Sequence, residues 1–118
     1  MKMIADVAVG VVALLHACFL VLEMFLWDRP FGLKTFGMTP EKAAATKALA
    51  MNQGLYNGFL AAGLAWGLLW SGSFALAIKI FFLGCVIVAG IFGALTASRK
   101  ILWLQAVPAA VALALLGF

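Results

Sequence analysis

Four apolar stretches alternate with short polar connections along this chain. The first three are long enough to cross a hydrocarbon core of about 30 Å as helices that rise about 1.5 Å per residue. The fourth is shorter, and we expect Pro108 to kink it. Because the connections are short, neighbouring helices should run antiparallel. The pattern predicts an all-α fold in one integral membrane domain, residues 1–118: a four-transmembrane-helix antiparallel bundle of up-down-up-down order. The predicted helices span about residues 3–27, 41–70, 74–97 and 101–117.

The connection between the first two helices reads as a loop over Asp28–Thr39, with Pro30 as the helix breaker. The next helix should begin at Thr39-Pro40-Glu41, where Thr39 is the cap, Pro40 takes the first helical position and Glu41 favours the helix dipole. Glycines recur along the second and third helices and would let neighbouring helices approach closely, so these faces could also form a homo-oligomer. They are Gly54, Gly58, Gly63, Gly67, Gly84, Gly90 and Gly93.

The composition makes the lipid bilayer the expected partner of this chain. Of 118 residues, 67% are hydrophobic and 10% are charged, whereas soluble domains are roughly half apolar and a quarter charged. The net charge of +4 does not indicate nucleic-acid binding, because the basic residues lie at the ends of the apolar segments. Cys18 and Cys85 lie within apolar segments and read as buried thiols. The first segment carries Asp6 and lacks a small-residue cleavage site, so we interpret it as a retained span.

Basic residues predict the orientation. They flank the first and third connections, which the positive-inside rule places in the cytoplasm, with both termini on the outer side. Asp6 and Lys79 should both lie toward the outer face, where they could pair. The basic residues of the inner side are Arg29, Lys34, Lys42, Lys47, Arg99 and Lys100.

The stretch from Met51 to Gly58 contains two Asn, a Gln and a Tyr inside a segment that otherwise reads as a membrane-spanning helix. Unpaired amides in hydrocarbon are costly, so these groups need partners inside the protein. Counted from the inner ends of the helices, Glu23, Asn52 and Gln105 share one level, and His16 and Asn57 share a deeper one. We therefore predict a polar pocket that opens toward the cytoplasm. The predicted ligand-binding residues are His16, Glu23, Asn52, Gln53, Tyr56, Asn57 and Gln105.

Three functions remain open for this pocket. It could bind or transport a small molecule. It could also be an enzyme site in which His16, Glu23 and Tyr56 supply acid–base chemistry to a lipophilic substrate. In the third case the amides are hydrogen-bond glue between helices and the protein is a structural or accessory subunit. His16 and Glu23 lie about 10.5 Å apart along one helix, too far to ligate one ion. We therefore expect no metal, and no motif for a cofactor is present.

Several motifs together resemble the small bacterial membrane proteins of domain-of-unknown-function family 1304. The resemblance covers nearly the whole chain, and the Asn52–Gly58 stretch is its most specific part. It implies four transmembrane helices in a bacterial inner membrane, so the termini would be periplasmic, and it implies no activity. The motifs are Leu22–Trp27, Phe36–Pro40, Asn52–Gly63, Gln105 and Pro108-Ala109.

Overall fold

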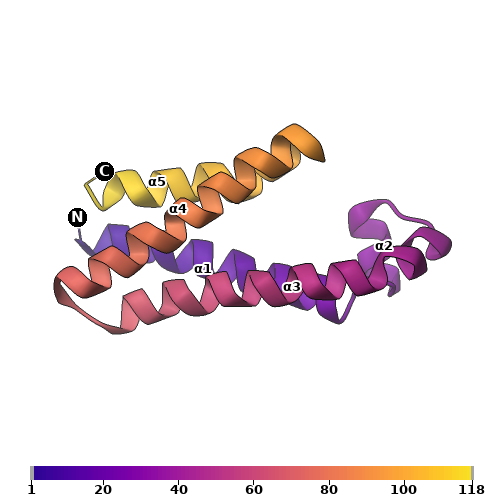
Figure 1. Ribbon diagram of the computed structural model, residues 1–118, viewed down its shortest axis with the longest axis horizontal. Coiled ribbons are helices and arrows are strands. Elements are labelled where there is room, and N and C mark those ends of the chain that lie inside the picture. Colours follow the sequence, from indigo (N-terminus) through magenta and orange to yellow (C-terminus); the bar gives the residue numbers. More distant parts are fainter. Residues whose placement is uncertain (1, 118) are drawn as a thin grey trace. The chain divides into compact units, whose positions relative to one another are not determined.

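The computed structural model describes residues 2–117, and all regular structure in this range is helical (Figure 1). The predicted all-α character is therefore confirmed. Within these described residues, two helices, α1 and α4, are long and apolar enough to cross a membrane, with mean hydropathies of 2.3 and 2.5. The elements are α1 Lys2–Met24, α2 Pro30–Phe36, α3 Pro40–Leu69, α4 Gly72–Thr96, the π-helical turn η1 Leu102–Ala106 and α5 Val107–Leu115.

Helix α3 begins at Pro40, with Thr39 as its cap, as the sequence predicts. The backbone N–H of Lys42 donates to the hydroxyl of Thr39 at 3.2 Å, which satisfies one of the N–H groups that a helix start leaves open. Pro40 is the first helical residue and Glu41 lies in the first turn, where the helix dipole favours an acid.

The expected loop over residues 28–39 is wrong in one respect, because it contains the short helix α2. Pro30 does not only end a helix here. Its fixed φ also suits the first turn of a helix, and α2 begins at this residue. Gly37 closes α2 with φ of 61° and ψ of 43°, a left-handed conformation that glycine adopts without strain. Helix α1 also ends earlier than expected, at Met24 instead of Trp27.

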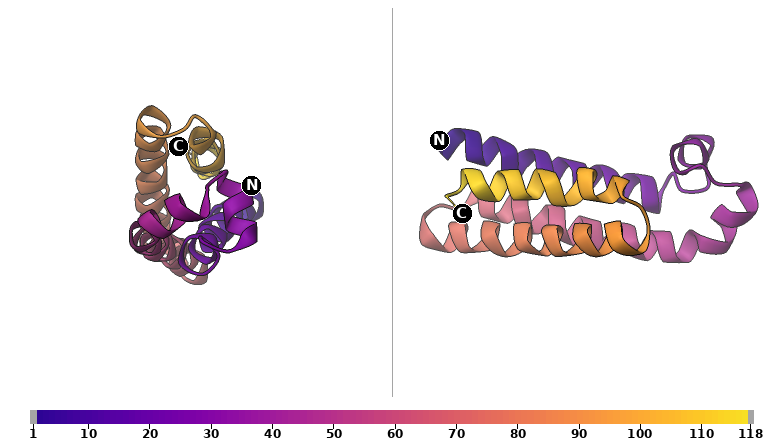
Figure 2. Two further views of the ribbon diagram at one scale, coloured as in Figure 1. Left: turned by 90° about the vertical axis from the view of Figure 1, so that its right-hand side faces the viewer. Right: turned by 90° about the horizontal axis from the view of Figure 1, so that it is seen from above.

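Residues 1–15 and 60–118 form one compact part of the chain. Within it, α5 runs back along α4 (Figure 2). A Cβ atom at Gly90 would lie 2.6 Å from the backbone nitrogen of Ala106, so this glycine permits the close approach. The prediction of contact positions is confirmed at Gly90 and Gly93 and wrong at Gly84, where no described atom lies within 4 Å. The buried core of this part is Val9, Val12, Leu64, Leu83, Val86, Ala109 and Ala112.

Pro108 coincides with an irregularity in the last helix, as expected, although this takes the form of a π turn. The π turn η1 covers Leu102–Ala106, just before Val107 and Pro108. A proline lacks the N–H that the carbonyl of Leu104 would accept in an α-helix, and its ring crowds that carbonyl. Widening the preceding turn relieves both problems.

Residues 16–59 form the second compact part, which contains the end of α1, all of α2 and most of α3. Helix α2 folds onto the turn that follows α1, and the buried Gly32 leaves room for the backbone carbonyls of Leu26 and Trp27. The rings of Trp27 and Phe36 lie 4.8 Å apart.

Candidate functional site

A hydrogen bond joins two polar side chains within residues 16–59. The side-chain amide of Asn57 donates from Nδ2 to Oε1 of Glu23 at 2.5 Å. Glu23 lies in the last turn of α1, and Asn57 lies in the middle of α3. Asn57 is 4% exposed, and Glu23 is partly buried. A carboxyl group and an amide are thus held together in mostly apolar surroundings.

Two glycines of α3 make this contact possible. A Cβ at Gly54 would lie 3.0 Å from Cβ of Glu23 and 3.2 Å from the backbone oxygen of Leu20. A Cβ at Gly58 would lie 2.6 Å from Cδ1 of Leu20. Without side chains at these positions α3 lies directly against α1, as the glycine spacing predicts. The close approach brings the short Asn57 side chain within reach of Glu23.

The pairing differs from the one that depth counting gives. The count places Glu23 level with Asn52, whereas the structure places it beside Asn57. The count assumes a helix as far as Trp27, but α1 ends at Met24. The residues after Met24 follow irregular backbone, which covers more distance per residue than the 1.5 Å of a helix. Glu23 consequently meets α3 further along its length.

The other predicted site residues of this part of the chain have different surroundings. His16 is fully buried, and its ring meets Phe19 edge-on at 5.2 Å. Asn52 and Gln53 are exposed. Tyr56 is 55% exposed, with its ring edge-on to Phe59 at 5.6 Å. The side-chain hydrogen bond thus brings together two of the predicted residues, and the roles of the others stay predictions.

Gln105 belongs to the compact part formed by residues 1–15 and 60–118, so the structure describes it separately from Glu23 and Asn57. It lies within the π turn η1 and is partly buried. Such turns often occur at functional positions, but they also follow from a nearby proline, and Pro108 is present here.

Two contacts that sequence reasoning missed hold the turn after α1 to the start of α3. The indole N–H of Trp27 donates to the hydroxyl of Thr46 at 3.1 Å. The ammonium of Lys47 lies 2.9 Å from the carboxylate of Asp28, on the surface. The hydrogen bond from Lys47 is the main reason that the pKa of Asp28 lies below its ordinary value. No signal in the sequence marks Thr46 as the partner of Trp27.

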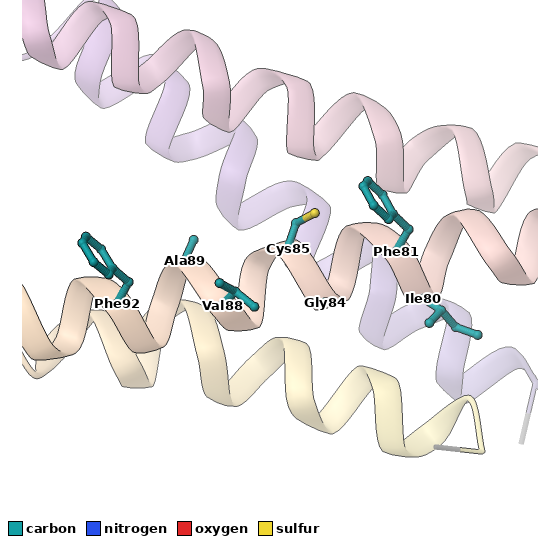
Figure 3. A pocket seen from close by; sticks show the side chains of 7 residues that line it. All are labelled: Ile80, Phe81, Gly84, Cys85, Val88, Ala89 and Phe92. Carbon is teal, nitrogen blue, oxygen red and sulfur yellow. The ribbon is translucent and has the colours of Figure 1, made fainter.

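An apolar groove of about 690 Å³ runs along α4 (Figure 3). Phe81, Val88 and Phe92 line it, together with Gly84, whose missing side chain leaves the space open. Cys85 carries the only polar side-chain atom among the lining residues. The groove suits an acyl chain or another apolar surface better than a polar substrate. Within residues 2–117, no cluster of three or more His, Cys, Asp or Glu side chains could hold a metal ion.

Comparison with known proteins agrees with the resemblance seen in the sequence. Residues 10–117 match the model of a family described as a protein of unknown function, DUF1304. No curated protein and no solved structure matches the chain. The match covers far more than half of the sequence. It includes Glu23, Asn57 and the two glycines of α3 that allow their contact, Gly54 and Gly58. The chain therefore belongs to the DUF1304 family.

Proposed function

We propose that this protein spans the bacterial inner membrane with four helices in up-down-up-down order and binds a small polar molecule at Glu23 and Asn57, in recognition or in transport. The single observation that carries this proposal is the hydrogen bond of 2.5 Å between Asn57 and Glu23. Support for the membrane setting comes from the length and hydropathy of α1 and α4. Support also comes from the exposed apolar side chains along α1 and α4, such as Val7 and Leu95.

The chemistry of the pair favours a ligand with N–H or O–H donors. The amide of Asn57 uses one donor on Glu23, and a carboxylate has a second oxygen that accepts hydrogen bonds. The carbonyl oxygen of the Asn57 side chain is a further acceptor. An amine, a guanidine or a polyol would match these acceptors. Glu23 meets an amide, which cannot exchange a proton with it, and this favours binding over acid–base catalysis.

The wider site in this proposal includes His16, Asn52, Gln53 and Tyr56, and it opens toward the cytoplasm. A homo-oligomer remains part of the proposal, because four helices offer little room for a transport path. Most glycines of α3 and α4 pack against the same chain. Gly84 in the α4 groove has open space, so it is the position that a second copy would use.

The function is tested by flux into liposomes that contain the purified protein. We expect uptake of methylammonium, a small N–H donor, and of protons above the level of protein-free liposomes. Glu23→Gln keeps the shape of the side chain and an oxygen that accepts from Asn57, but it removes the charge, so flux should fall to background. Glu41→Gln is the matched control, because it neutralises an exposed acid at the start of α3, and it should retain wild-type flux.

Two results would contradict the proposal. Equal flux in wild type and Glu23→Gln would remove the transport role. A change in thermal stability without any change in flux or in methylammonium binding would mean that the pair only locks α1 to α3. The stability of each variant is measured in the same detergent, so that loss of flux is not confused with loss of folding.

The orientation is tested separately with thiols. In a chain where Cys18 and Cys85 are replaced by Ser and Ala, we introduce Thr35→Cys or Lys2→Cys, both at exposed positions. A membrane-impermeant maleimide added to intact cells should label position 2 and should reach position 35 only after permeabilisation. The reverse pattern would overturn the proposed orientation.

A further inference from the structure

A second cavity with polar lining residues lies in the compact part formed by residues 1–15 and 60–118. It has a volume of about 360 Å³ and is lined by the beginning of α1, the connection between α3 and α4, the first turns of α4 and the end of α5. Three of its lining side chains are charged: Lys2, Asp6 and Lys79. All of them are distinct from the residues of the site at Glu23 and Asn57.

The cavity contains a partly buried ion pair. The ammonium nitrogen of Lys79 lies 2.8 Å from Oδ1 of Asp6, and the Lys79 side chain is 7% exposed against 31% for Asp6. Gly67 of α3 leaves room for the lysine stem, because a Cβ at this position would lie 2.7 Å from Cγ of Lys79. The pairing predicted from sequence is confirmed, and the ammonium is held in place at the cavity wall.

The charges of the cavity do not cancel. Asp6 balances Lys79, and Lys2 adds a further positive charge at an exposed position. An ammonium has three N–H donors, and the bond to Asp6 uses one of them. The cavity therefore combines a surplus positive charge with N–H donors from two helices, which attracts an anion.

The start of α4 adds to the same field. Ser71 and Gly72 line the cavity, and α4 begins at Gly72, whose φ of 84° only glycine adopts readily. The first N–H groups of a helix have no partner within it, and the helix dipole is positive at this end. Among the described residues, the Ser71 side chain does not cap these groups.

We propose that this cavity binds a phosphate group. The donors come from Lys2, Lys79 and the start of α4, and a phosphate offers oxygens in more directions than a carboxylate does. Leu76 and Leu115 give the cavity apolar walls, and Trp70 lies at its lining as an aromatic residue suited to the membrane interface. Such a site takes the phosphate of a glycerolipid headgroup or free inorganic phosphate.

The test is a titration of the purified full-length protein in detergent. Binding is followed by native mass spectrometry and by tryptophan fluorescence, since Trp70 lines the cavity. The probes are dioleoyl phosphatidylglycerol, inorganic phosphate, and dioleoylglycerol as a lipid without phosphate. Lys2→Gln should weaken phosphatidylglycerol binding about five-fold, because it removes one charge near the phosphate. Lys34→Gln, an exposed lysine of α2, should leave it unchanged.

A double variant, Asp6→Asn with Lys79→Gln, keeps the pair hydrogen-bonded and neutral. It should weaken binding about ten-fold or more, because a charged donor to the phosphate is lost.

If inorganic phosphate binds at the same residues, the ligand is free phosphate, whereas binding of phosphatidylglycerol alone identifies a headgroup site. Equal binding of dioleoylglycerol and phosphatidylglycerol overturns the proposal. So does a Lys2→Gln variant that behaves like Lys34→Gln, and this exposed position stays informative even if the double variant fails to fold.

Discussion

Glu23 and Asp6 are two carboxyl groups of the same helix, α1, and they meet opposite kinds of partner. Asp6 is paired with the ammonium of Lys79 from α4 at 2.8 Å. Glu23 is paired with the side-chain amide of Asn57 from α3 at 2.5 Å. Both contacts depend on a glycine that lets the partner come close, Gly67 in one case and Gly54 in the other.

The difference lies in the charge balance. The pair of Asp6 and Lys79 is neutral as a whole, so it is stable without a third group. An amide carries no charge, so Asn57 does not balance the charge of an ionised Glu23, whereas a bound cationic ligand would. The first arrangement therefore holds α1 to α4 whether or not the proposed phosphate is bound, and the second is suited to binding something that comes and goes.

The largest expected effect comes from breaking the ion pair. Lys79→Met should lower the free energy of unfolding by about 3 kcal/mol, because Asp6 then remains partly buried without its cation. Chemical unfolding in micelles measures the change. Adding Asp6→Asn to this variant should recover most of the loss, since the lone charge is gone. Lys100→Met, at an exposed position, is the control; a Lys79→Met variant as stable as this control would refute the view that the pair stabilises the fold.

The next effect tests the close approach at the other carboxyl group. Gly54→Ala should cost about 2 kcal/mol, because its Cβ would crowd the backbone oxygen of Leu20 at 3.2 Å, and a backbone atom cannot move aside cheaply. It should also reduce methylammonium binding, since Asn57 is pushed away from Glu23. The measurements are chemical unfolding and the liposome assay.

Gly84→Ala is the matched control for this prediction. It is also a glycine within a long helix, but no described atom lies within 4 Å of the place that its Cβ would take. The substitution should raise the free energy of unfolding by up to about 1 kcal/mol through helix propensity alone. If Gly54→Ala and Gly84→Ala change the free energy of unfolding by the same amount and in the same direction, the close contact of α3 with α1 at Gly54 is refuted.

A smaller effect is expected from the hydrogen bond itself. In a double-mutant cycle with Glu23→Ala and Asn57→Ala, the coupling free energy should be about 1 kcal/mol, within the range found for polar contacts between membrane helices. A second cycle, Glu41→Ala with Asn57→Ala, should give a coupling near zero because these residues are in different turns of α3. Two cycles with equal coupling would mean that the effect is not local to the pair.

Part of this architecture follows from sequence because its causes are local. Apolar length and polar interruptions predict the long helices, and Thr39 is an N-cap because its hydroxyl reaches an N–H three residues further on. Helix α2 escapes prediction because Pro30 both breaks one helix and starts the next. Gly84 and Gly90 look alike in sequence, and only the packing of α4 against η1 decides which of them is a contact.

The sequence identifies Glu23 and Asn57 as members of the candidate site but does not predict their pairing. The register between two helices depends on where each one ends, and the end of α1 at Met24 has no strong local signal. A better signal is present in α3, where Gly54 and Asn57 are three residues apart and so share one helix face. A polar residue on the face that small residues open to a neighbour is the one expected to meet that neighbour.

The smallest effect concerns a third carboxylate–lysine pair, Asp28 with Lys47, which is an exposed counterpart of Asp6 with Lys79. The hydrogen bond from Lys47 lowers the pKa of Asp28 in the folded protein, so this pair stabilises the fold at pH values above the ordinary pKa of aspartate. That contribution is lost as the pH falls through the lower pKa of the folded state. Thermal unfolding of wild type and Asp28→Asn should therefore differ slightly at neutral pH and converge in strong acid. Added salt should also remove the difference, because it screens exposed charges more than the partly buried pair of Asp6 and Lys79. If salt weakened both pairs equally, the distinction between a partly buried pair and a surface pair would not hold for this protein.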